Sequence, residues 1–133
     1  MSKPTAPNIL VIDSDPRDRR LLRRILENAG YCVSECGTYL EAVEVIRNGN
    51  FDVIVLNLGP PGGSGFDVLE VAQSIRPKPR VIVTTGYPKP LSEQIFDSAR
   101  KLGAAGAVDK EEAQESLAST VRSLLLESAE DIG

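Results

Sequence analysis

The sequence predicts a doubly wound α/β domain, built from five strand–helix units around a parallel sheet of order 2-1-3-4-5. Short continuous apolar runs at residues 9–12, 53–56 and 81–83 are typical of strands buried on both faces of a sheet. Between these runs, apolar residues recur at the spacing of amphipathic helices. Strands that alternate with helices favour a parallel sheet with helices on both faces.

The first half of the chain contains two helices with start and stop signals. Asp15 is expected to cap the first helix, which has a proline at its first position and ends at Gly30. The mixed segment 31–34 is expected to be an edge strand. Thr38 and Glu41 form a capping box that begins the second helix, and an Asn-Gly pair ends it. The apolar faces comprise Leu21, Leu22, Ile25, Leu26 and Ala29 in the first helix and Ala42, Val43 and Ile46 in the second.

The second half contains three further helices and the remaining strands. A helix is expected over residues 64–75, with Ser64 as its N-cap and Pro77 just beyond its end. The next helix closes at Gly103, and the Ala-rich segment 104–108 is the fifth strand. The last two helices are predicted from the apolar stripes Leu91, Ile95, Ala99 and Leu102, and Ala113, Leu117, Val121, Leu124 and Leu125.

Length and composition allow one domain of this kind. The chain has 133 residues, 41% of them hydrophobic, and we expect the domain to cover 8–126, with tails at 1–7 and 127–133. The N-terminus lacks the apolar core of a signal peptide and no apolar run is long enough to span a membrane, so the sequence predicts a soluble, cytoplasmic protein. Cys32 and Cys36 on one strand would lie roughly 13 Å apart, beyond the limit of about 7 Å for a disulfide, and are expected to be reduced and to fill the core.

Charge is unevenly distributed along the chain. The net charge of -4 argues against nucleic acid as a direct partner. The predicted strand order places the first and last helices on one face of the sheet, so we expect mutual charge complementarity and solvation between them. A docking surface on the arginine-rich first helix is the alternative. The charges concerned are Arg17, Arg19, Arg20, Arg23 and Arg24 in the first helix and Glu111, Glu112 and Glu115 at the start of the last.

Polar residues follow four of the predicted strands. The first and third strands are neighbours in this strand order, and ligands of open α/β sheets bind outside the carboxyl ends of the strands at such a point. Asp13 and Asn57 follow these two strands, residues 84–86 end the fourth, and Lys110 follows the fifth. An acid, an amide, hydroxyls and an ammonium are therefore expected to meet at one edge of the sheet.

These residues give the chain a resemblance to a known family. Over residues 8–126 it resembles the receiver domain of bacterial two-component response regulators (CheY-like), which implies a flavodoxin-like fold. Residues 9–16 resemble the acidic opening of that family, and 52–65 resemble its phosphoacceptor strand and loop. Residues 81–86 resemble the strand with the switch threonine, and 103–110 resemble the segment that ends in the family's lysine.

The residues also depart from the family pattern. The resemblance implies that the position of Asn57 normally holds the aspartate that takes a phosphoryl group from a histidine kinase, and an amide is a much weaker nucleophile. Ser14 stands where the family has a second Mg²⁺-binding acid, so Asp13 alone remains of that pair. Asp15 lies outside the pair and is expected to cap a helix. The sequence therefore predicts an atypical member, a pseudo-receiver.

Loss of two carboxylates weakens the expected affinity for metal. A unit charge roughly 4 Å from a cation contributes on the order of 4 kcal/mol at an effective dielectric constant near ~20, before desolvation is subtracted. One carboxylate, Asp13, facing the ammonium of Lys110 would make a nearly neutral pocket. We therefore expect weak or absent Mg²⁺ binding, no other cofactor, and Asp13 as the ligand if any metal is held.

The positions that resemble the family's switch are altered too. Thr85 is retained, but the aromatic residue that the family has in the fifth strand is replaced by Ala107. The family normally has a proline after the lysine, often in a cis bond, and here Glu111 follows Lys110, where a cis bond would cost about 3 kcal/mol. The sequence predicts a receiver locked in one state, or switched by something other than phosphate.

The leading hypothesis is a non-enzymatic module that binds proteins independently of phosphorylation. The resemblance implies a histidine kinase, a phosphotransfer protein or an output protein as the partner, or a homodimer through the fourth helix, fifth strand and fifth helix. Phe96 and Leu126 are candidates for an exposed patch there. Neither nucleic acid nor membrane is expected as a direct partner.

Two alternatives remain open at this point. Asp13 or Asp15 is a candidate for a residual phosphoacceptor. Alternatively, the protein is a sensor, and the altered pocket binds a small molecule or an anion. The glycine-rich loop 59–65 lacks the ending of a P-loop, but backbone N–H groups at the helix start after it could hold an anion.

Overall fold

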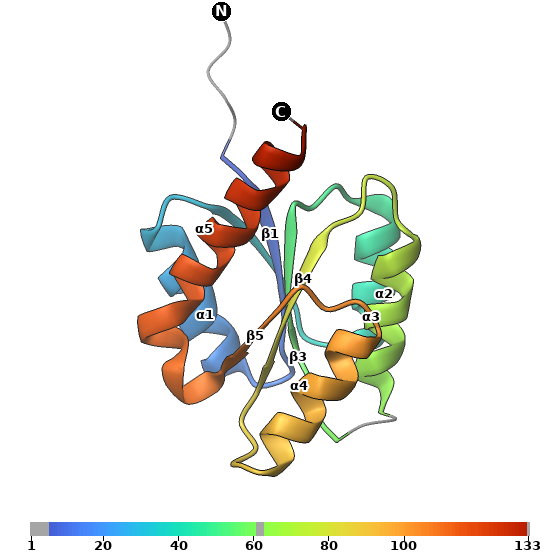
Figure 1. Cartoon of the computed structure of the whole chain (residues 1–133), viewed down its shortest axis with the longest axis vertical. Helices are drawn as coiled ribbons and strands as arrows, with labels where there is room; N and C mark the ends of the chain where they lie inside the picture. The colour runs from blue at the N-terminus through green and yellow to red at the C-terminus, as the bar shows by residue number, and fades with distance from the viewer. Residues whose placement is uncertain (1–5, 61–62, 133) are drawn as a thin grey trace, which may run out of the picture.

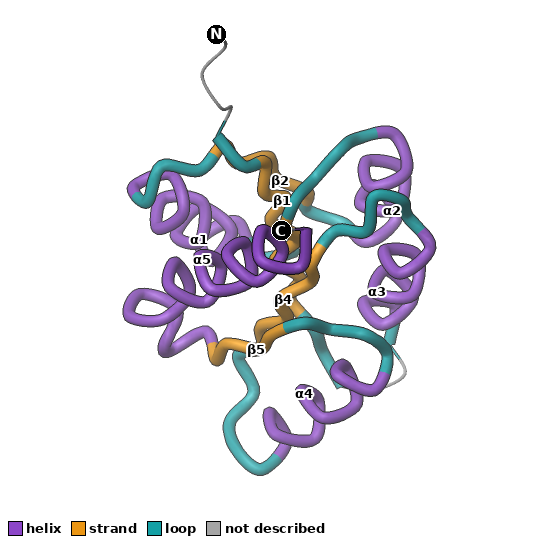
Figure 2. The backbone as a smooth tube through the Cα atoms, turned by 45° about the horizontal axis from the view of Figure 1, so that its top comes forward, coloured by secondary structure: helices purple, strands orange, loops and turns teal. Residues whose placement is uncertain are grey.

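The computed structural model describes residues 6–60 and 63–132 and has the predicted flavodoxin-like architecture (Figure 1). A five-stranded parallel sheet has the order β2-β1-β3-β4-β5. Helices α1 and α5 cover one face and α2, α3 and α4 cover the other, as the tube view also shows (Figure 2). The strands are β1 Asn8–Ile12, β2 Cys32–Cys36, β3 Val53–Asn57, β4 Arg80–Thr85 and β5 Gly106–Asp109. The helices are α1 Pro16–Asn28, α2 Tyr39–Asn48, α3 Ser64–Ser74, α4 Leu91–Lys101 and α5 Ala113–Ile132, with a 3₁₀ turn at Lys110–Glu112.

The hydrophobic core has two halves, one on each face of the sheet. Because side chains alternate along a strand, Leu10 and Ile12 pack toward α2, α3 and α4, while Ile9 and Val11 pack toward α1 and α5. All four are at most 1% exposed. Burial on both faces is the reason that the central strands have continuous apolar sequences rather than alternating ones.

The register of the sheet brings the ends of the strands together. Ile12 pairs with Leu56, Asn57 with Thr84, and Thr85 with Asp109. The residues that follow these strands therefore lie at one edge of the sheet, as predicted.

Side-chain caps begin α1 and α2 as the sequence predicts. Asp15 Oδ1 accepts hydrogen bonds from the backbone N–H groups of Arg17 at 2.8 Å and Asp18 at 3.4 Å. These two bonds hold the pKa of the Asp15 carboxyl below its usual value, and the bond from Arg17 has the larger effect. Thr38 Oγ1 accepts from the N–H of Glu41 at 3.1 Å. Gly30, just after α1, has φ of +96°, a conformation that glycine adopts without steric cost.

Some element boundaries and one cap differ from the prediction. The N-cap of α3 is Gly63, with no side-chain hydrogen bond, and Ser64 is the first helical residue. The fifth strand begins at Gly106 rather than 104, because the N–H groups of Ala104 and Ala105 are used in the turn after α4 and its link to β4. Helix α5 continues to Ile132, beyond the predicted domain end at 126.

Some apolar residues that helical periodicity placed on buried faces are exposed in the structure. Leu21 and Leu102 were expected on apolar stripes but are 41% and 37% exposed. Phe96 was a candidate for an exposed patch, and it is only 8% exposed and belongs to the core. Cys36 is buried, which raises the pKa of its thiol to about 11, but Cys32 is exposed and does not fill the core.

Most of the predicted N-terminal tail lies outside the described residues. Among the helices in the described ranges, none combines the length and hydropathy that a membrane crossing requires.

The two helix caps give a matched test. Thr38→Ala should lower the free energy of unfolding by about 1 kcal/mol, because it removes a partner of an otherwise unpaired N–H group. Ser64→Ala should change it by a few tenths at most, since Ser64 makes no cap hydrogen bond. Urea denaturation of both variants measures the difference. Equal losses for the two variants would contradict the assignment of the caps.

Candidate functional site

The centre of the site is a buried ion pair between the ends of β1 and β5. Asp13 follows β1 and is 1% exposed, and its Oδ2 lies 2.8 Å from Nζ of Lys110, which follows β5. The other carboxylate oxygen, Oδ1, accepts a hydrogen bond from the N–H of Asp15 at 2.9 Å. Oδ1 is therefore hydrogen-bonded within the protein, whereas Oδ2 is paired with the charge of Lys110 but has no hydrogen-bond partner among the described residues.

A second carboxylate, that of Asp18, also binds Lys110. Asp18 lies in the first turn of α1, and its Oδ2 accepts a hydrogen bond from Lys110 Nζ at 2.7 Å. The prediction that one carboxylate faces Lys110 was therefore wrong, because there are two. The sequence carried one signal for this, an acidic residue one turn into the helix that Asp15 caps.

The surroundings of Lys110 keep it charged. Burial of the ammonium alone would lower its pKa, but the hydrogen bonds and negative charges of Asp13 and Asp18 outweigh this and raise the pKa of Lys110 above its usual value. The side chain is 18% exposed. Although a non-proline residue, Glu111, follows it, Lys110 reaches the end of β1, and its charge is used within the protein.

Asn57 ends β3 beside this ion pair. Its Oδ1 atom is buried and has no hydrogen-bond partner among the described residues. Its backbone oxygen accepts a hydrogen bond from the hydroxyl of Tyr39 at 2.8 Å. Burial first, and then the nearby charge of Asp13, raises the pKa of Tyr39, which keeps the hydroxyl protonated as a donor. A hollow of about 430 Å³ lies here, lined by Ser14, Tyr39, Asn57, Leu58, Gly59, Gly86, Tyr87 and Lys110.

The other predicted site residues lie at or near the same edge. Thr85 is 1% exposed, and its Oγ1 accepts the N–H of Tyr87 at 3.3 Å. Ala107 is partly buried and packs against the core of the α2, α3 and α4 face. Ser14 is exposed and lines the hollow, whereas Asp15 uses its carboxylate to cap α1.

The donor set does not fit Mg²⁺, which the family resemblance implies. The carboxylates of Asp13 and Asp18 already contact the ammonium of Lys110, at 2.8 Å and 2.7 Å. Ser14 offers a neutral hydroxyl, and Asn57 a neutral amide. In the described part of the chain, no three Asp, Glu, Cys or His side chains are grouped so that they could hold a metal ion. Mg²⁺ sheds its waters reluctantly, and here it would also have to compete with the ammonium of Lys110 for both carboxylates.

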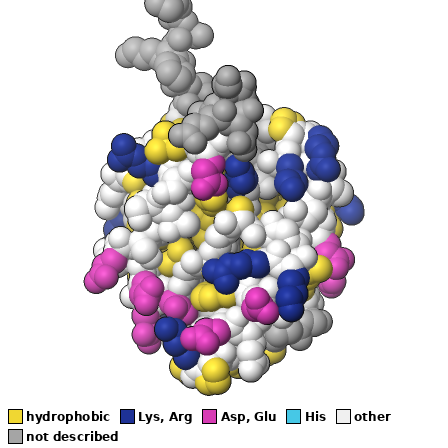
Figure 3. Space-filling view, viewed as in Figure 1, with side chains coloured by type: hydrophobic (Ala, Val, Ile, Leu, Met, Phe, Trp, Pro, Cys, Tyr) yellow, Lys and Arg dark blue, Asp and Glu magenta, His cyan; other side chains and the backbone are white. Residues whose placement is uncertain are grey.

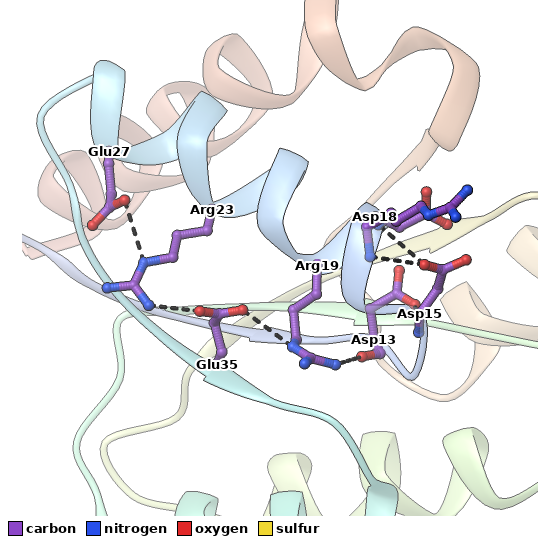
Figure 4. Close-up of polar contacts among 8 residues, drawn as sticks. Asp13, Asp15, Asp18, Arg19, Arg23, Glu27 and Glu35 are labelled. Carbon is purple, nitrogen blue, oxygen red and sulfur yellow. Dashed lines mark hydrogen bonds and ion pairs between the residues drawn. The ribbon is translucent and has the colours of Figure 1, made fainter.

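Arginines of α1 connect the site to β2 (Figure 4). Arg19 donates from Nη1 to the backbone oxygen of Asp13 at 2.8 Å and from Nε to Glu35 at 3.1 Å. Arg23 binds Glu35 at 2.6 Å and Glu27 at 3.2 Å. Hydrogen bonds from Arg23 and then Arg19 lower the pKa of Glu35 despite its partial burial. This network holds the end of β1 against β2 and α1.

The remaining arginines of α1 form a separate exposed face. Arg17, Arg20 and Arg24 surround the exposed Leu21 and line a hollow of about 220 Å³. Within residues 6–60 and 63–127, none of the three forms an ion pair, and none of the arginines of α1 pairs with the acidic residues at the start of α5. Helices α1 and α5 do pack together. The charge complementarity that we predicted between them is not observed among the described residues.

Comparisons with known proteins point to one protein family. A family model described as "Response regulator receiver domain" matches residues 9–122. The transcriptional regulatory protein ResD of Bacillus subtilis is 33% identical over 84 residues, which are 63% of this chain and 35% of ResD. The regulator BvgA of Bordetella pertussis is 31% identical over 106 residues, 78% of this chain and 49% of BvgA. The chain thus spans about a third to half of these relatives.

A solved structure shows the same similarity in three dimensions. The response regulator protein TrrA of Thermotoga maritima, solved in complex with Mg(2+)-BeF, superposes with a TM-score of 0.75 at 28% identity. The match covers 89% of this chain and 98% of TrrA.

Removal of the lysine tests the buried ion pair. Lys110→Met should lower the free energy of unfolding by about 3 kcal/mol at neutral pH, because it leaves the buried Asp13 without a counter-ion. The double variant with Asp13→Asn should recover much of this loss. Because the pKa of Lys110 is raised, its contribution is complete below pH 10.5, the usual lysine value, and is lost as the pH rises through the higher folded value.

Lys101→Met is the matched control for this experiment. Its ion pair with Asp97 is exposed, so the variant should lose at most about 1 kcal/mol. Denaturation of all four proteins measures these values. An equal loss for Lys110→Met and Lys101→Met would contradict the account of a buried charge pair.

Proposed function

The chain belongs to the response regulator receiver domain family of two-component signalling, and on this premise we propose that it is an atypical receiver that binds protein partners without accepting a phosphoryl group. The observation that carries the proposal is Asn57 at the end of β3, an amide where the family's chemistry requires a carboxylate. Its buried oxygen has no partner among the described residues, and Lys110 is bound to other groups. We place this activity in the cytoplasm.

Neither alternative acceptor is favoured by its surroundings. Asp13 is buried and held by Lys110, so a phosphoryl donor has little access to it. Asp15 is exposed, but its Oδ1 atom accepts two N–H groups at the start of α1. Phosphorylation there would remove the cap and would therefore oppose the local fold.

Weak or absent Mg²⁺ binding belongs to the same proposal. The two carboxylates near the site, those of Asp13 and Asp18, are both paired with the ammonium of Lys110. A metal would have to displace that ammonium from both Asp13 and Asp18, and it would meet only neutral side chains at Ser14 and Asn57. The same ion pairs disfavour the anion-sensor alternative, since the positive charge of Lys110 is already balanced by Asp13 and Asp18.

We assign partner binding to the exposed face of α1. Arg17, Arg20 and Arg24 are on one side of the helix, around the exposed Leu21, and the positive charge stands out on a chain with net charge -4. An acidic protein segment with an apolar residue at its centre fits this face. For a homodimer through α4, β5 and α5 the support is smaller, because Phe96 is core and only Leu126 of the two candidates is exposed, at 54%.

Phosphorylation is tested with acetyl phosphate and with Mg²⁺ plus beryllofluoride. We expect no acyl phosphate by mass spectrometry and no saturable amide shifts around Asp13 and Thr85 by NMR. The double variant Asn57→Asp with Ser14→Asp regains carboxylates at the two altered positions and should respond to both reagents. A stable acyl phosphate on the natural chain, at any residue, would refute the proposal.

Docking is tested by removing the unpaired arginines together. A triple change to alanine at Arg17, Arg20 and Arg24 should weaken binding of a synthetic acidic Glu/Leu helical peptide about tenfold or more, because exposed ion pairs contribute up to ~1 kcal/mol each. The control variant has alanine at Arg47, Arg100 and Lys101 and removes the same charge from α2 and α4. Equal weakening in both variants would show that net charge, and not the α1 face, governs binding.

A further inference from the structure

A second hollow lies beside the candidate site and is not used by the function proposed above. It has a volume of about 270 Å³ and lies between the loop after β4, the start of α4 and the end of β5. From its lining we propose that it binds a small organic amine, of the size of an aliphatic diamine. The lining residues that carry the argument are Tyr87, Ser92, Asp109, Glu111 and Glu112.

The negatively charged side chains that line this hollow favour a cation as its ligand. Asp109, Glu111 and Glu112 line it, and in the described part of the chain none of them forms an ion pair. Lys110 lies between two of these residues in sequence, but its ammonium binds Asp13 and Asp18 instead. Lys89 is 70% exposed, and its Nζ lies 3.9 Å from Glu93. Acidic side chains gather on the lower left of the space-filling view, over the region where α5 begins (Figure 3).

A buried hydroxyl at the same place lacks a partner. Ser92, near the start of α4, is 1% exposed and lines the hollow, yet its Oγ has no hydrogen-bond partner among the described residues. Buried polar atoms in folded proteins are normally paired, and leaving one unpaired is unfavourable. An N–H donor of a bound ligand would supply the missing partner.

The arrangement favours an organic cation over a metal ion. No three carboxylates in the described residues converge closely enough to hold a metal, so the negative charges are spread over the wall. Tyr87, which is 43% exposed, and Pro88 add apolar surface, and a tyrosine ring attracts an ammonium placed over its face. The volume is below the range of roughly 300–1,000 Å³ for drug-sized ligands, which suits a short chain with an ammonium at each end.

This hollow shares residues with the candidate site. Gly86 and Tyr87 line both, and Thr85 lines the amine hollow while its Oγ1 holds the N–H of Tyr87. An amine bound here would therefore contact the loop that also borders Asn57 and Lys110. Amine binding would affect the candidate site through the backbone of residues 86–87, which both hollows share, and would need no chemical modification of Asn57.

The test is an NMR titration of the full chain with 1,4-diaminobutane at constant ionic strength. We expect saturable amide shifts at residues 86–92 and 109–112, and none with the neutral analogue 1,4-butanediol. Asp109→Asn with Glu112→Gln should weaken binding about fivefold or more, in line with the loss of two exposed ion pairs. Asp67→Asn with Glu70→Gln on α3 removes the same charge and should leave the affinity unchanged.

Ser92→Ala separates a ligand role from a structural one. It should weaken amine binding severalfold without lowering the free energy of unfolding, because the hydroxyl it removes has no partner in the free protein. A lack of saturable shifts, an equal response to 1,4-butanediol, or equal weakening in the α3 variant would overturn the proposal. So would a Ser92→Ala variant that is destabilised but binds the amine as before.

Discussion

The buried carboxylate of Asp13 is the constraint on which the rest of the site depends. A charge that is 1% exposed must be paired, and the ammonium of Lys110 at 2.8 Å is its counter-ion. This pair joins the ends of β1 and β5, which are not neighbours in the sheet. Asp18 adds the start of α1 to the same contact. The lysine is thus held by two carboxylates, one at the end of β1 and one at the start of α1.

The fold was predictable because its signals are local. Continuous apolar runs identified the buried strands, and short-range caps such as Thr38 with Glu41 identified helix starts. Errors arose where several residues compete for one role. Ser64 was expected to be the cap of α3 because serine is a preferred N-cap residue, but Gly63 holds that position without a side-chain hydrogen bond. Apolar spacing alone could not distinguish the exposed Leu21 from its buried neighbour Leu22.

The site was predictable only in part, because charges pair across the fold. Strand order and strand ends sufficed to bring Asp13, Asn57 and Lys110 to one edge. The contact of Asp18 with Lys110 joins residues 92 positions apart and depends on which way both side chains turn. Likewise, Arg19 and Arg23 bind Glu35 on β2 and not the acidic residues of α5, although both β2 and α5 pack against α1. The arginines on the other side of α1, Arg17, Arg20 and Arg24, have no ion pair among the described residues.

The most direct test of the account is the state of the Lys110 ammonium, followed by NMR of its Nζ and Cε during titration with base and with Mg²⁺ plus beryllofluoride. If Asp13 and Asp18 hold the lysine, its pKa will lie above the usual lysine value, and its signals will not move with the reagents. Asp18→Asn will bring the pKa down. A lysine with an ordinary pKa, or one whose signals shift and saturate with beryllofluoride, would show that the ammonium is free to bind an anion and would contradict the account.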